Sequence, residues 1–276
     1  MTDDFTPAHA LLSAHRRDGD RVRFDVPADW LQGRTAYGGL IAAMGTQAMR
    51  VVTGDAWPPT LRLRALQTNF IGPVVAGPAE VAVTVLREGK SVRQIQATVK
   101  SEGLVAATLV GVYGSPRTSA LDALAPTQQA LRVAAADAPS RPFVAGLMPA
   151  FLQHLHIGWA AGDPPGSGGK GWQTGLYLRL VGDRADLIDR DVLTVLLADA
   201  PPSPAVGHFR QLAAASSVCW ALELLPDDAP VGSEDWWRID TVARSAADGY
   251  VNHSSTLWNS AGQAVAFGHQ MVTVYG

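Results

Sequence analysis

The two halves of this chain end in similar sequences, and this repetition constrains the fold more than any other feature. The segments SEGLVAATLVGVYG (101–114) and SAGQAVAFGHQMVTVYG (260–276) share a turn glycine, alternating apolar residues and a terminal Val-Tyr-Gly. In each half these residues close a series of strand-like segments that follows one helix-like segment. A supersecondary unit repeated in the same order indicates an internal duplication.

The first half predicts a short strand, one helix and then an antiparallel meander. Residues 21–26 alternate apolar and polar side chains, which is typical of a half-buried strand. Residues 39–52 have helical periodicity and many small side chains, so this helix can lie close to a sheet. Strand-like segments separated by turn dipeptides follow it, at residues 61–70, 79–87, 91–101 and 104–113.

The second half repeats this order after a segment of different composition. Residues 116–145 are rich in Ala, Pro, Ser and Asp, which indicates a linker between a unit at 1–115 and a unit at 146–276. The second unit predicts a helix and four strand-like segments, at residues 187–200, 210–225, 236–247, 249–259 and 263–275.

A long helix wrapped by one curved antiparallel sheet is the hot-dog arrangement, so the predicted fold is an α+β double hot-dog. One such sheet leaves the backbone groups of an edge strand unpaired. Docking two sheets edge to edge satisfies those groups, and we therefore expect the two units to pair side by side.

Composition restricts the partners and the compartment. Hydrophobic residues make up 47% and charged residues 17%, the balance of a globular chain, and the net charge of −3 argues against nucleic acid as the main partner. No apolar stretch approaches a membrane span, and the acidic start contains no signal-peptide core. The single cysteine, Cys219, excludes an internal disulfide and suits a reducing compartment. We expect a cytoplasmic protein.

Several motifs resemble the acyl-CoA thioesterase II family. The turn Arg87-Glu88-Gly89-Lys90-Ser91 between two strands and the helix entry GRTAYGGLIAAMGTQAM (33–49) are similar to the family's first hot-dog. Three further segments are similar to its second hot-dog: LADAPPSP (197–204), AASSVCWALEL (214–224) and AVAFGHQMVTVYG (264–276). The resemblance covers nearly the whole chain apart from the linker.

This resemblance implies hydrolysis of acyl-CoA by an activated water, without a metal, a cofactor or a covalent intermediate. The family holds this water with an Asp, a Gln and a Ser or Thr of the second hot-dog. Asp199 and Gln270 match the first two positions. The hydroxyl position falls on Ala214, which departs from the family, so we expect Ser216, or alternatively Ser217, to supply the hydroxyl.

The chemistry of these groups agrees with that role. A carboxylate such as Asp199 accepts a proton from water, and an amide such as Gln270 orients the water without titrating. Thioester hydrolysis also places negative charge on the former carbonyl oxygen. Backbone N–H groups at a helix amino terminus stabilise such charge, and we expect those near Gly38 and Gly39 to do so.

Other functions remain open at this level. A hot-dog hydratase needs a His at the helix, and neither predicted helix contains one. A non-catalytic acyl-CoA-binding protein is favoured by Ala214. His154 and His156 have the spacing of one strand face, but a metal site needs further ligands. Pairing into a homodimer or a larger homo-oligomer is common in the family that the motifs resemble.

Overall fold

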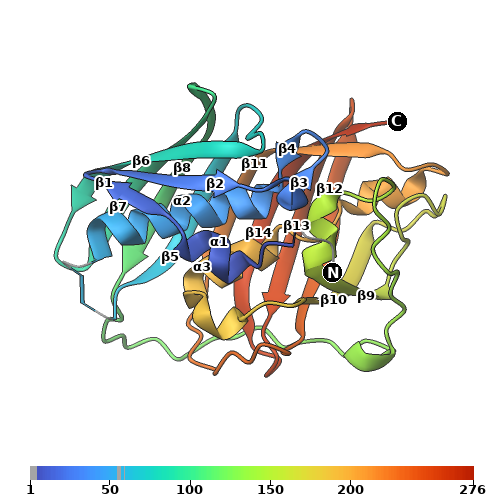
Figure 1. The fold of residues 1–276 in the computed structure, drawn as a ribbon. Helices are drawn as coiled ribbons and strands as arrows, with labels where there is room; N and C mark the ends of the chain where they lie inside the picture. The colour runs from blue at the N-terminus through green and yellow to red at the C-terminus, as the bar shows by residue number, and fades with distance from the viewer. Residues whose placement is uncertain (1–4, 55–56, 59) are drawn as a thin grey trace.

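The computed structural model describes residues 5–54, 57–58 and 60–276. Two helices, α2 and α3, lie on one face of a large antiparallel sheet (Figure 1). The expected helix and four strands of the first unit are present. In chain order this unit contains α1 (Ala8–Ser13), β1 (Arg16–Asp18), β2 (Arg21–Val26), β3 (Leu31–Gln32), β4 (Thr35–Ala36), α2 (Gly38–Thr53), β5 (Arg62–Phe70), β6 (Gly77–Glu88), β7 (Val92–Ser101) and β8 (Leu104–Gly114).

The second unit contains the expected helix and four strands, and two strands before the helix that the periodicity did not predict. These two are β9 (Leu155–Ala161) and β10 (Gln173–Leu180), which flank a loop rich in glycine and proline. The other elements are α3 (Arg190–Ala198), β11 (Ala214–Leu224), β12 (Trp237–Ala247), β13 (Tyr250–Trp258) and β14 (Ala264–Tyr275).

The order of the strands shows the duplication directly. The 12 strands of the main sheet run β1-β2-β6-β7-β8-β5 and then β11-β14-β13-β12-β10-β9. Reading outward from the centre, β5, β8, β7 and β6 of the first unit correspond to β11, β14, β13 and β12 of the second. The two half-sheets join through antiparallel pairing of β5 with β11, in which Cys219 lies opposite Asn69 and Glu223 opposite Ala65. The expected edge-to-edge docking is therefore a continuous hydrogen-bonded sheet.

The two helices pack side by side and antiparallel: Tyr37, just before α2, contacts Leu196 near the end of α3, and Arg50 near the end of α2 pairs with Asp189 at the start of α3. Residues of α2 are small and mostly buried, so its backbone packs closely on β6 and β7. The helix α3 is shorter than the predicted 187–200 because the Asp189 side chain caps its first turn by accepting from the N–H groups of Asp191 and Val192. Its last residue is Ala198, so Asp199 follows directly at the C-cap.

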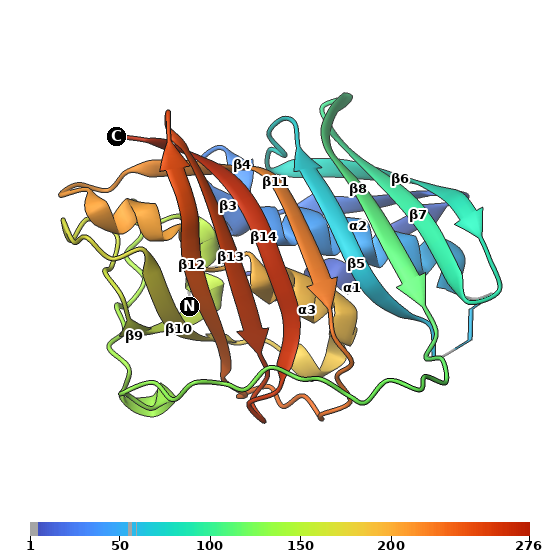
Figure 2. The same cartoon turned by 180° about the vertical axis from the view of Figure 1, so that it is seen from behind.

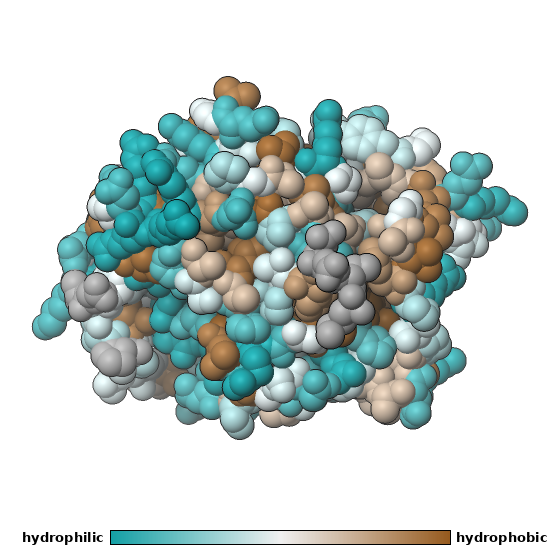
Figure 3. Space-filling model, viewed as in Figure 1, coloured by the Kyte–Doolittle hydropathy of each residue, from teal (hydrophilic) through white to brown (hydrophobic). Residues whose placement is uncertain are grey.

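On the opposite face of the sheet, the described residues form no helix of comparable length, and the segment between β8 and β9 runs along the lower edge (Figure 2). On the helix-bearing face, apolar and polar side chains are interspersed (Figure 3). None of the described helices has the length and apolar character that crossing a membrane requires.

His154 and His156 do not share a strand face, contrary to the prediction. His154 ends the 3-10 helix Ala150–His154, where it is buried and its ring stacks on Trp30 with a centroid separation of 4.1 Å. His156 lies in β9 and its ring contacts Trp236. The chain turns out of the helix between them, which removes the alternation that a strand would impose. Among the described residues, no three metal-binding side chains gather at one place.

Candidate functional site

Asp199 lies where the amino terminus of α2 meets the carboxyl end of α3. The Tyr37 hydroxyl, just before α2, donates to the Leu196 carbonyl oxygen of α3 at 2.6 Å and joins the two helix ends. The Gly39 backbone N–H in the first turn of α2 donates to the Asp199 carboxylate. A residue of the second unit is thus held by the helix of the first, which is a relationship that only the folded duplication creates.

Gln270 lies on β14 and connects three side chains. Its Nε2 donates to Asp199 Oδ1 at 2.7 Å and to Ser217 Oγ at 2.7 Å. Its Oε1 is 2.9 Å from His253 Nε2 on the neighbouring strand β13. The structure therefore brings together Asp199 and Gln270, the two residues that the sequence assigns to water activation, and adds His253, which sequence reasoning missed.

The hydroxyl beside Gln270 belongs to Ser217 rather than Ser216. Ser216 is exposed on the far face of the sheet, opposite Thr273. The pairing of β11 with β14 shifts between Ser217 and Cys219, which leaves Val218 as an extra residue in a β-bulge. This bulge changes which residues face the helices, so Ser217 lies on the same face as Gln270. Ala214 lies opposite Tyr275 on the face of Ser216 and cannot take part.

The two glycines at the start of α2 allow the backbone to approach this group. A Cβ atom on Gly38 would lie 2.5 Å from Asp199 Oδ2, and one on Gly39 would lie 2.6 Å from the Leu196 carbonyl oxygen. The Gly39 N–H is engaged by Asp199. An oxyanion role for the Gly38 N–H stays a prediction.

Burial governs the protonation of Asp199. Burial of the carboxyl group raises the pKa of Asp199 to about 7, although hydrogen bonds from Gln270 and from Gly39 N–H act in the opposite direction. Burial also raises the pKa of Tyr37 well above its usual range, and the nearby Asp199 charge adds to that increase. A carboxylate whose pKa lies near neutrality both ionises and accepts a proton at physiological pH, which is what a general base requires.

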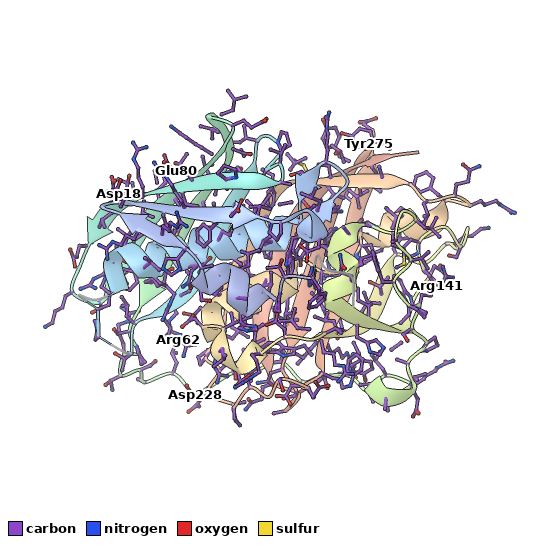
Figure 4. The ribbon with its side chains drawn as sticks, in the orientation of Figure 1. Asp18, Arg62, Glu80, Arg141, Asp228 and Tyr275 are labelled. Carbon is purple, nitrogen blue, oxygen red and sulfur yellow. The ribbon has the colours of Figure 1, made fainter. Side chains whose placement is uncertain are left out.

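A hollow elsewhere on the surface contains none of these residues. It is lined by Arg64, Arg117, Pro226 and Asp228 among others. Arg62 and Asp228 mark the end of the molecule that lies opposite Tyr275 (Figure 4). In the β11–β14 pair, Ser217 lies towards the Tyr275 end and Gln270 lies near the middle. The hollow is therefore separate from the group around Asp199.

Comparison with known proteins gives consistent matches along the chain. Residues 26–114 match the family model of the acyl-CoA thioesterase N-terminal domain, and residues 130–274 match that of the C-terminal domain. None of the curated proteins matches the chain in sequence.

Solved structures share the whole fold at low sequence identity. A conserved hot-dog protein from Alicyclobacillus acidocaldarius has a TM-score of 0.82 at 21% identity over 99% of both chains. An acyl-CoA thioesterase II from Mycobacterium marinum has a TM-score of 0.68 at 18% identity over 98% of both chains. A dehydratase domain from Pseudomonas fluorescens has a TM-score of 0.60 at 12% identity, over 98% of this chain and 100% of its own. At these identities the structures establish the double hot-dog fold.

Proposed function

The chain belongs to the acyl-CoA thioesterase family, and we propose that it hydrolyses acyl-CoA with a water molecule activated by Asp199. The two family models match successive halves, so the assignment covers both hot-dog units. The hydrolysis of acyl-CoA to a free acid and CoA follows from the family. We propose which residues perform this hydrolysis.

In this mechanism, the ionised Asp199 accepts a proton from water as the water oxygen bonds to the thioester carbonyl carbon. Ser217 and Gln270 orient the water for attack. Gln270 is hydrogen-bonded to both the Asp199 carboxylate and the Ser217 hydroxyl, so the three groups are held together. The negative charge that develops on the carbonyl oxygen is stabilised by the Gly38 N–H and the positive end of the α2 dipole. The C–S bond then breaks, CoA leaves as a thiolate that takes up the proton held by Asp199, the carboxylate is restored and the acid is released.

One observation supports this assignment most strongly: the Asp199 carboxylate is hydrogen-bonded by Gln270 of β14 and by Gly39 of the opposite unit. A helix C-cap aspartate with a purely structural role has no need of a partner from the last strand. The arrangement therefore fits a base held between the two hot-dogs.

Two other functions are not favoured. A dehydratase shares the fold, but the family models that match are those of a thioesterase. The described helices α2 and α3 contain no histidine, the residue such chemistry places at the helix. A binding protein without activity was favoured by Ala214, yet Ser217 supplies a hydroxyl next to Gln270.

A thiol-release assay with medium- and long-chain acyl-CoA tests the proposal. We expect the wild type to release CoA and both Asp199→Ala and Gln270→Ala to lose at least about a hundredfold in kcat. Hydrolysis unchanged by both substitutions contradicts the proposed site. Binding of acyl-CoA without hydrolysis by the wild type supports the non-catalytic alternative.

We also infer a role in lipid metabolism in the cytoplasm, consistent with a single free cysteine, Cys219. The main sheet ends in the edge strands β1 and β9. Residues 139–140 already pair with part of the outer edge of β9, so the outer backbone groups of β1 are those that suit pairing with a second copy. Light scattering after size exclusion is expected to show a homodimer or larger homo-oligomer; a monomer at micromolar concentration contradicts this.

A further inference from the structure

His253 is the residue next to the site whose role the mechanism above leaves unassigned. It lies directly opposite Gln270 in the pairing of β13 with β14, and its Nε2 is 2.9 Å from Gln270 Oε1. The side chain is buried, with 6% of its surface exposed. Its Nδ1 is buried without a hydrogen-bond partner among the described residues. Burying an imidazole ring with one nitrogen unpaired costs free energy. We therefore infer that the hydrogen bond of the other nitrogen to Gln270 has a specific role.

The hydrogen-bond directions follow from the chemistry of the partners. An ionised carboxylate only accepts hydrogen bonds, so the group of Gln270 that faces Asp199 must be the Nε2 amide. Gln270 Oε1 then faces His253, and a carbonyl oxygen only accepts. His253 must therefore donate from Nε2, which makes it a neutral imidazole with its proton on Nε2. A protonated ring would leave a buried donor at Nδ1 unsatisfied.

The orientation of the Gln270 amide is coupled to the protonation of Asp199. If the amide turned over, its Oε1 would face the carboxyl group and would favour the protonated acid, which donates. With His253 donating to Oε1, turning over would place two donors, His253 Nε2–H and the amide N–H₂, against each other. That conflict is the type of penalty that holds a buried amide in one orientation.

We propose that His253 is a positioning residue that locks the Gln270 amide with Nε2 towards Asp199 and so keeps Asp199 in its ionised, base-competent form. The inference rests on the proposed function of Asp199 and Gln270. His253 acts through Gln270 and does not contact the water or the thioester. Burial lowers the pKa of His253, against a smaller opposing effect of its hydrogen bond with Gln270, and this agrees with the neutral form.

The groups that influence this lock come from each element that packs around it. Asp199 lies at the end of α3, Tyr37 precedes α2, and β13 contributes His253 itself. Strand β11 contributes the hydroxyl of Ser217, which does not titrate in the relevant range. Asp199, whose pKa is about 7, is thus the group of this set that changes charge near neutral pH, whereas burial lowers the pKa of His253 and favours its neutral form there.

Three variants test the lock. His253→Leu removes the hydrogen-bond donor. His253→Gln restores a donor, because the glutamine Nε2 occupies nearly the position of the histidine Nε2. His269→Leu is the control, since it makes the same change at an exposed histidine on β14. We expect His253→Leu to lower kcat about tenfold with little change in KM, and to move the acid limb of the kcat profile to higher pH. His253→Gln and His269→Leu should both behave like the wild type.

A wild-type kcat and pH profile in folded His253→Leu overturns the proposal. So does a His253→Gln variant as impaired as His253→Leu, since that pattern indicates a packing role. These outcomes differ from failure of the proposed function, in which Gln270→Ala itself remains active.

A measurement on the unmodified protein decides the question if His253→Leu does not fold. In ¹⁵N-histidine-labelled wild type at pH 7–8, NMR shifts of the ring nitrogens report which one is protonated. We expect His253 to be protonated on Nε2 and bare on Nδ1. The opposite tautomer, or a doubly protonated ring, overturns the proposal.

Discussion

The amide Nε2 of Gln270 lies 2.7 Å from the Asp199 carboxylate, and this contact joins the last strand of the chain to the end of its second helix. The same amide contacts Ser217 at 2.7 Å, so one side chain organises a base and a hydroxyl. The Gly39 N–H reaches Asp199 from the other unit. The proposed catalytic group therefore depends on the docking of the two hot-dogs.

Ser217 and Ser216 form a matched pair, because they are adjacent but lie on opposite faces of β11. We expect Ser217→Ala to lower kcat for acyl-CoA hydrolysis by about tenfold, through loss of the hydroxyl beside Gln270. Ser216→Ala should retain the wild-type rate since that side chain is exposed on the far face. Steady-state kinetics of both variants decide the matter, and equal losses would be inconsistent with the bulge at Val218.

Gly38 is expected to tolerate no side chain. The Cβ of Gly38→Ala would lie 2.5 Å from Asp199 Oδ2, which forces the carboxylate out of position. We predict a loss in kcat of at least about a hundredfold, because a displaced carboxylate no longer reaches the water whose proton it accepts. Gly54→Ala, at the other end of α2, is the control because its Cβ would meet nothing within 4 Å. Wild-type turnover in Gly38→Ala would argue against the close approach of α2 to Asp199.

The raised pKa of Asp199 also makes stability depend on pH. The pKa of Asp199 is about 7 in the fold against an ordinary value of 3.8, so between these values the folded chain binds a proton that the unfolded chain does not. Its contribution to the free energy of unfolding is therefore lost as pH rises from about 4 to 7. Asp199→Asn removes the ionisable group and should exceed the wild type in Tm at pH 8 by at least about 2–4 °C.

Thermal unfolding at pH 5 and pH 8 measures this effect. Asp122→Asn in the exposed linker segment is the control and should follow the wild type at both values. If Asp199→Asn has the same Tm as the wild type at pH 8, the carboxylate carries no burial penalty in the fold.

Much of the fold could be predicted from periodicity. The α2 helix and the four strands after it were predictable because long alternating or helical segments are separated by turn residues, and the second unit repeats them. Strands β9 and β10 could not be predicted in this way, since they flank a loop rich in glycine and proline. They join the sheet only after folding, when β10 pairs with β12 and β9 pairs with β10.

The sequence named Asp199 and Gln270, which the structure brings into contact, but it could not give the geometry around them. Asp199 and Gln270 were identified from the resemblance to a family. The choice between Ser216 and Ser217 depended on a bulge at Val218, which changes the face of the sheet on which the β11 side chains lie. His253 could not be found from sequence. It stands in a strand among polar residues, and only the register of β13 with β14 places it opposite Gln270.

Asp199 is the base of the proposed mechanism, and a pH–rate profile tests this role most directly. Thiol release from acyl-CoA would be measured from pH 5 to 9 for the wild type and for Asp199→Asn. The wild-type kcat should fall below an apparent pKa of about 7, where Asp199 takes up a proton. Asp199→Asn should lose at least about a hundredfold in kcat and lose this limb. An Asp199→Asn variant that keeps both the rate and the limb would contradict the account.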